Sequence, residues 1–98
     1  MSYTITYYSD TVQAEIRALP ETLIARFFSL TDRMIQNGAN LGQPHTQAIG
    51  DGLFELRLKG VEGIARVFYC AWIGKRIVML HSFVKKTQKT PPRELRTA

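Results

Sequence analysis

The sequence predicts an α+β domain in which two N-terminal helices pack on one face of a small antiparallel sheet. Apolar residues recur at helical spacing between residues 10 and 37. From residue 53 they alternate with polar residues in three segments that glycine-containing turns separate. The predicted order is β-α-α-β-β-β, followed by a short C-terminal helix or tail. A chain of 98 residues, 45% of them hydrophobic, fits a single domain over residues 1–98.

Residue type defines the first two elements. Residues 3–8 (YTITYY) are mostly β-branched or aromatic, which predicts a short strand. Ser9 and Asp10 are residue types that begin helices, and Val12 and Ile16 follow at helical spacing. Pro20 ends this helix and fits the first turn of the next one, where its missing N–H does no harm.

The second helix is predicted from an apolar stripe whose members recur every three or four residues: Leu23, Phe27, Leu30 and Met34. Asn37 and Gly38 form a typical C-terminal stop. Residues 39–50 (ANLGQPHTQAIG) show no clear period, so we expect a loop there.

Three strands are predicted after this loop, at residues 53–58, 64–72 and 76–84, with turns at 60–63 and 73–75. In the first strand, alternation places Phe54, Leu56 and Leu58 on one side of the sheet. Glu55, Arg57 and Lys59 therefore point to the other side. Pro91 and Pro92 end any strand, and residues 93–98 are long enough for one turn of helix.

Positive charge is concentrated in the second half of the chain. Residues 57–98 hold ten of the thirteen Lys and Arg residues against two carboxylates, a net charge of +8. Residues 1–56 carry −3, and the whole chain carries +5. Such an asymmetry points to a polyanionic partner, of which nucleic acid is the most plausible.

Five cations come from the three predicted strands and the exit of the last one: Arg57, Arg66, Lys85, Lys86 and Lys89. If the helices cover one face of the sheet, the other face can present these groups together. They can then bind RNA phosphates and stabilise the charge that develops when a 2′-hydroxyl attacks phosphorus. This chemistry needs no metal and no cofactor, and a lysine crowded by cations can act as the base. The alternative is that each is an ordinary surface charge.

The remaining candidates have two interpretations each. His81 can exchange protons near neutral pH, or it can be a partly buried histidine with a structural hydrogen bond. Phe68 alternates to the same side as Arg66 and can stack on a base, or it can pack in the core. His45 is either simply a loop residue, which is the favoured interpretation, or a loop residue that touches a substrate. Two histidines and one cysteine far apart do not form a zinc pattern. Among the cations, Lys89 is assigned to RNA binding together with Lys59 and Arg93.

Three segments are similar to one known group of proteins: residues 53–57 (LFELR), 65–69 (ARVFY) and 80–91 (LHSFVKKTQKTP). They resemble the RelE/ParE superfamily of type II toxins, most closely its phage-related HigB-like branch. The ending with the pattern LH.F.KK..KTP is fairly specific to that branch. The resemblance covers essentially the whole chain, because the length and the element order also agree.

The resemblance implies a small curved antiparallel sheet with two N-terminal helices packed on it. It also implies a ribosome-dependent mRNA endonuclease that arrests translation. The expected partners are the ribosome, mRNA and an antitoxin, which is usually a helix-turn-helix protein. Operator DNA is expected to be contacted only by the antitoxin. The family site residues carried over by motif are Arg57, Arg66, Lys85, Lys86 and Lys89. Because the chain has no Tyr after Tyr69 and no His after His81, the base used by some relatives cannot be assigned.

Two other functions remain open. ParE-like members of the same superfamily inhibit DNA gyrase without nuclease chemistry, and a non-catalytic RNA-binding module would use the same cations. The N-terminus shows no signal peptide, no apolar segment is long enough to span a bilayer, and one cysteine fits a reducing compartment. We therefore expect a cytoplasmic protein with no membrane partner.

Overall fold

The computed structural model describes residues 2–72 and 74–85. The predicted C-terminal turn at residues 93–98 lies outside them. The helices and strands are β1 (Thr4–Tyr7), α1 (Asp10–Arg17), α2 (Glu21–Asn37), β2 (Thr46–Gly50), β3 (Leu53–Gly60), β4 (Gly63–Trp72) and β5 (Arg76–Lys85).

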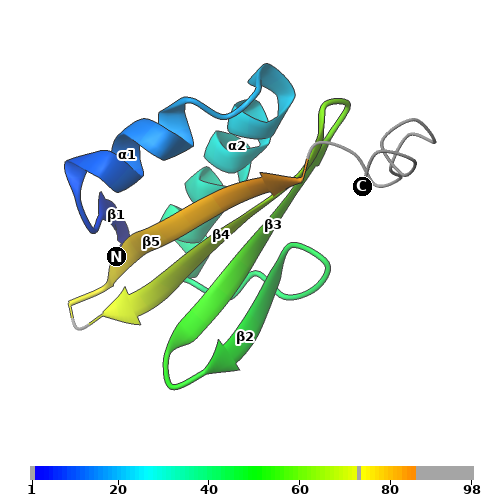
Figure 1. Cartoon of the computed structure of the whole chain (residues 1–98). Helices are drawn as coiled ribbons and strands as arrows, with labels where there is room; N and C mark the ends of the chain where they lie inside the picture. Colours follow the sequence, from blue (N-terminus) through cyan, green and yellow to red (C-terminus); the bar gives the residue numbers. More distant parts are fainter. Residues whose placement is uncertain (1, 73, 86–98) are drawn as a thin grey trace.

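The five strands form one sheet in the order β1-β5-β4-β3-β2, and both helices lie on the same face of it (Figure 1). The predicted fold class is confirmed, as are both helices, the three-stranded meander and its turns. Two details of the prediction were wrong. The segment predicted as a loop contains β2, and β1 pairs with β5 in parallel, so that the sheet is mixed and not purely antiparallel.

Strand β2 is held by its neighbour more than by its own sequence. Its residues pair antiparallel with β3, and Thr46 lies opposite Leu56. Only Thr46 is fully buried, and the pairing shifts register between Ala48 and Gly50. A strand that is exposed over most of its length lacks the apolar alternation from which strands are predicted.

The start of α2 is capped by a residue distant in sequence. Ser9 caps α1 in the usual way, because its hydroxyl accepts a hydrogen bond from the N–H of Val12 at 3.2 Å. Pro20, at the same position of α2, makes no side-chain cap. The carboxylate of Glu62, in the β3–β4 turn, instead accepts hydrogen bonds from the backbone N–H of Thr22, at 3.4 Å, and from its hydroxyl. The hairpin tip is therefore fastened to the helix N-terminus.

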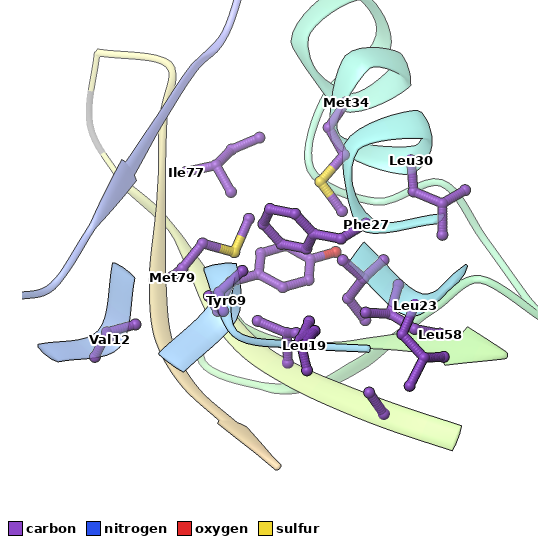
Figure 2. Close-up of a cluster of buried hydrophobic side chains, with 14 residues drawn as sticks. Val12, Leu19, Leu23, Phe27, Leu30, Met34, Leu58, Tyr69, Ile77 and Met79 are labelled. Atoms are coloured by element: carbon purple, nitrogen blue, oxygen red, sulfur yellow. The ribbon is translucent and has the colours of Figure 1, made fainter. Parts of the chain in front are cut away.

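The core lies between the two helices and the sheet. Figure 2 shows the ring of Tyr69 among Phe27, Leu19 and Met79, which come from α2, the helix–helix connection and β5. The hydroxyl of Tyr69 donates a hydrogen bond to the carbonyl oxygen of Ala39 at 2.5 Å. Burial raises the pKa of Tyr69, because the phenolate would be poorly solvated there. This core fixes one face of the sheet against the helices.

Candidate nucleic-acid interface

The sheet face that turns away from the helices carries most of the described candidate residues. On β3 and β4 the alternate residues Leu56, Leu58, Ala65 and Val67 are fully buried beneath the helices. Their neighbours in sequence therefore point the other way. We call this surface the outer face; it is formed by Gln47, Glu55, Arg57, Arg66, Phe68, His81 and Phe83.

A β-bulge in β5 places two of these residues. Tyr69 pairs with Met79, but the preceding residue, Phe68, pairs with His81, so that Leu80 is one residue too many for regular pairing. A shift of one residue moves side chains to the opposite face of a sheet. Met79 is accordingly buried in the core, whereas His81 is exposed on the outer face.

The bulge also brings aromatic rings together beside the arginines. Phe83 lies directly opposite Arg66 in the β4–β5 ladder. Its ring centroid is 5.9 Å from that of Phe68 and 6.4 Å from that of His81. Phe83 is 37% exposed and lies where β5 has passed the end of its pairing with β1, so that β4 is its neighbour in the described sheet. The rings of Phe68 and His81 are tilted by 30° and 33° against that of Phe83, so the three side chains form one aromatic cluster on the outer face.

One carboxylate holds both arginines of the outer face. Glu55 is only 7% exposed. Its Oε1 accepts from Nε of Arg57 at 3.1 Å, and its Oε2 accepts from a terminal nitrogen of Arg66 at 3.2 Å. Arg57 also donates to the side-chain oxygen of Gln47. These contacts orient the two guanidinium groups while using only some of their N–H donors in the described part of the chain.

A pocket of about 430 Å³ adjoins the outer face where β3 continues past the start of β2. Four of its lining residues are cations, contributed by α2, β3 and β4. The full lining comprises Arg26, Pro44, His45, Arg57, Leu58, Lys59, Ile64 and Arg66. The pocket is thus both strongly positive and partly apolar.

Comparison with known proteins places the chain in a family. A family model described as "Phage derived protein Gp49-like (DUF891)" matches residues 14–98. The chain belongs to the Gp49-like family. No curated protein matches the sequence of this Gp49-like protein.

Two solved structures share the fold of the Gp49-like protein. An arginine-to-alanine double mutant of the E. coli toxin RelE in the free state superposes with a TM-score of 0.64 at 12% identity, over 84% of this chain and 82% of that one. The archaeal RelE–RelB complex from Pyrococcus horikoshii OT3 gives a TM-score of 0.61 at 22% identity, over 92% of this chain and 100% of the other. The predicted resemblance to the RelE/ParE superfamily is therefore confirmed in the fold.

The structure brings together many, but not all, of the residues singled out from the Gp49-like sequence. Arg57, Arg66 and Lys59 line the pocket, and Phe68 and His81 lie on the outer face beside it. The backbone of Lys85 ends β5 opposite Ile64, at the pocket end of the sheet. Three further predicted cations, Lys86, Lys89 and Arg93, lie outside the described residues.

Sequence reasoning missed two participants of the Gp49-like site. Alternation placed Glu55 on the same side of the strand as Arg57, but it did not reveal that the carboxylate of Glu55 pairs with both arginines. Arg26 was not among the candidates from the sequence, and only the tertiary structure shows that it lines the pocket. In the described ranges no three His, Cys, Asp or Glu side chains group as a metal site would require. None of the helices described is long and apolar enough to cross a membrane.

Proposed function

We propose that this Gp49-like protein is the toxin of a toxin–antitoxin pair, and that it cuts mRNA on the ribosome. The observation that carries the proposal is the convergence of Arg57 and Arg66 on one face, beside a pocket with further cations. Planar guanidinium groups bind phosphate oxygens in pairs of hydrogen bonds. The RelE fold of the chain supports the same proposal, since one of its structural neighbours is called a toxin.

The proposed reaction needs little from the protein beyond position and charge. The 2′-hydroxyl of the RNA attacks the neighbouring phosphorus and the 5′-oxygen leaves, so that the enzyme supplies no nucleophile. Arg57 and Arg66 stabilise the extra negative charge on the phosphate oxygens in the transition state. His81 is exposed on the outer face and is suited to exchange a proton with the reacting oxygens. Lys85 and Lys86 remain sequence-based candidates for this proton transfer.

The partners follow from the same proposal. One neighbour in fold was solved as a RelE–RelB complex, which supports a cognate antitoxin for this chain. We propose a helix-turn-helix antitoxin that alone contacts operator DNA, together with the ribosome and mRNA as targets in the cytoplasm. A sheet face with two oriented arginines and three clustered rings explains RNA binding more directly than it explains binding to gyrase.

The test is cleavage of a defined mRNA by the purified protein, with and without ribosomes, mapped by primer extension. We expect new 5′ ends only when ribosomes are present. Arg66→Ala should reduce cleavage about a hundredfold or more, as loss of a group that stabilises transition-state charge predicts. Arg76→Ala is the matched control, because it removes the same charge from an exposed position. Arg76 begins β5, whereas Phe83, the residue opposite Arg66, lies near the end of that strand.

Other outcomes would decide for the alternatives. Intact mRNA together with inhibited supercoiling by gyrase would establish the ParE-like function. If the protein bound RNA tightly but neither cut transcripts nor halted growth, it would be a non-catalytic RNA-binding module. Folded Arg66→Ala protein that cuts as fast as the wild type would remove this residue from the site.

A further inference from the structure

The pocket has two kinds of wall. Arg26 and Lys59 supply positive charge from α2 and the end of β3, and both are exposed. Pro44 and Ile64 supply apolar surface, and the imidazole of His45 supplies a flat ring. The volume of about 430 Å³ lies within the range of small-molecule sites, roughly 300–1,000 Å³. A ligand that fits both walls has an anionic part and a flat, weakly polar part.

The loop at the mouth of the pocket is held in place by hydrogen bonds. Thr46, which is 1% exposed, donates from its hydroxyl to Oδ1 of Asn40 at 3.0 Å and accepts from the N–H of Gly42 at 2.9 Å. The backbone N–H of His45 donates a hydrogen bond to the carbonyl oxygen of Gly42 at 3.1 Å. The carbonyl oxygen of His45 accepts a hydrogen bond from the backbone N–H of Arg57 at 2.8 Å. The backbone of His45 is therefore fixed to β3 before any ligand arrives. Preorganisation of this kind lowers the entropic cost of binding.

The four cations that line the pocket differ in whether they already form a salt bridge with a carboxylate of the protein. Arg57 and Arg66 are paired with Glu55 and belong to both the pocket and the outer face. Arg26 and Lys59 form no salt bridge with any other described residue. They can accept an anion without first losing a carboxylate. The pocket thus continues the phosphate-binding surface from the outer face around the edge of β3.

We propose that this pocket binds one nucleotide of single-stranded RNA, adjacent to the phosphate held at the outer face. The phosphate of this nucleotide lies against Arg26 and Lys59, and its base stacks on the imidazole of His45 beside Pro44 and Ile64. Proteins recognise unpaired RNA bases by such stacking on flat side chains. The proposal rests on the proposed function and adds to it the part of the site that selects the base beside the cut.

The test measures binding directly, without ribosomes. The full chain is titrated with each nucleoside 3′-monophosphate and, separately, with inorganic phosphate, and amide shifts are followed by NMR. We expect nucleotides to bind more tightly than phosphate, with the largest shifts at His45 and Lys59. Arg26→Ala should weaken nucleotide binding about tenfold, which corresponds to one charge-assisted hydrogen bond. Arg33→Ala is the control, because it removes the same charge from an exposed position two turns further along α2 and should bind normally.

A second pair of variants separates stacking from charge. His45→Ala should weaken nucleotide binding but not phosphate binding, and His45→Phe, which keeps a flat ring, should restore it. Equal affinities for nucleotides and phosphate would overturn the proposal, as would equal effects of Arg26→Ala and Arg33→Ala in folded proteins. Nucleotide binding at the pocket without mRNA cleavage on ribosomes would support the nucleotide site and refute the proposed nuclease function. mRNA cleavage without nucleotide binding at the pocket would support the nuclease function and refute the nucleotide site.

Discussion

Arg57 and Arg66 lie directly opposite each other in the β3–β4 ladder. Like charges at such a pair repel and by themselves destabilise a sheet. The carboxylate of Glu55 offsets this repulsion, because each of its oxygens accepts a hydrogen bond from a different arginine. The site therefore combines two oriented cations with one fixed negative charge, and this combination makes the effect of Glu55 testable.

Replacement Glu55→Gln should have opposite effects on RNA binding and on cleavage. Loss of the carboxylate leaves the outer face one charge more positive, so that a short 2′-O-methyl RNA should bind more tightly at low salt, with a steeper salt dependence. Cleavage should slow about tenfold or more, because the guanidinium groups are no longer held in one geometry. Fluorescence anisotropy at two salt concentrations and ribosome-dependent primer extension measure the two effects. Parallel changes in binding and cleavage would show that Glu55 does not position the arginines.

Replacement Gly60→Ala should destabilise the protein by about 1–3 kcal/mol, the usual cost of forcing an extra methyl group into a packed site. A Cβ atom at Gly60 would clash with Oγ1 of Thr22 and would lie 3.2 Å from Cδ2 of Leu23. The methyl group would push the end of β3 away from the start of α2. Urea unfolding measures the change.

The same substitution in a Thr22→Ala background tests whether Thr22 is the obstacle. The cost of Gly60→Ala should be smaller there, since the clashing oxygen is gone. A double-mutant cycle with the two single variants gives this coupling free energy. Additive effects would show that the backbone simply moves.

Glu62 should make the stability of the fold sensitive to acid. Hydrogen bonds from Thr22 hold the pKa of Glu62 below its ordinary value of 4.5, although partial desolvation opposes them. A carboxyl whose pKa is lower in the folded state stabilises that state above its unfolded pKa, and the contribution is lost as pH falls through the folded value. Glu62→Gln should thus be less stable than wild type at pH 7 and equally stable in strong acid.

Unfolding curves for both proteins across this pH range test the assignment. Glu21→Gln is the control, because it removes an exposed carboxylate from the first turn of α2 and leaves the hydrogen bonds of Glu62 intact. Its stability should therefore fall with acid as much as that of the wild type. A constant gap between wild type and Glu62→Gln at every pH would show that Glu62 acts through packing instead.

Replacement Tyr69→Phe should cost about 1–3 kcal/mol, because the carbonyl of Ala39 loses its hydrogen-bond donor. Tyr8→Phe is the control; Tyr8 is 73% exposed, and its replacement should change stability by less than about 0.5 kcal/mol. Burial raises the pKa of Tyr69 above its ordinary value of 10.0. The wild type should therefore lose stability as pH rises above 10, and Tyr69→Phe should lose less. Unfolding curves at neutral and alkaline pH check both statements.

The elements predicted correctly are those whose own sequence determines their structure. The apolar stripe of α2 is one such case, because Leu23, Phe27, Leu30 and Met34 are all buried in the structure. The β3–β4 hairpin is another, since its alternation and its glycine turn appear in consecutive residues. Local periodicity and turn chemistry were sufficient for both.

The features that sequence reasoning missed depend on contacts between distant residues. Strand β2 forms because β3 offers it a hydrogen-bonding edge, which no pattern within residues 46–50 reveals. The bulge at Leu80 likewise becomes visible only when β5 is aligned with β4. Glu55 is close in sequence to Arg57, but its second partner, Arg66, is reached only through the hairpin. Charge counting predicted that cations would gather, and the tertiary structure decides which ones do.

The pairing of β1 with β5 affects when the outer face is completed during folding. The hydroxyl of Thr6 lies within 3.5 Å of the carbonyl oxygen of Ile77, 71 positions later in the chain. β5 is therefore placed between the earliest strand and β4, and it brings His81 and Phe83 with it. Contacts so distant in sequence form late and slowly during folding. A nascent chain still lacking β5 would lack His81 and Phe83 of the outer face, so the candidate site would be complete only once almost all of the described chain had been made.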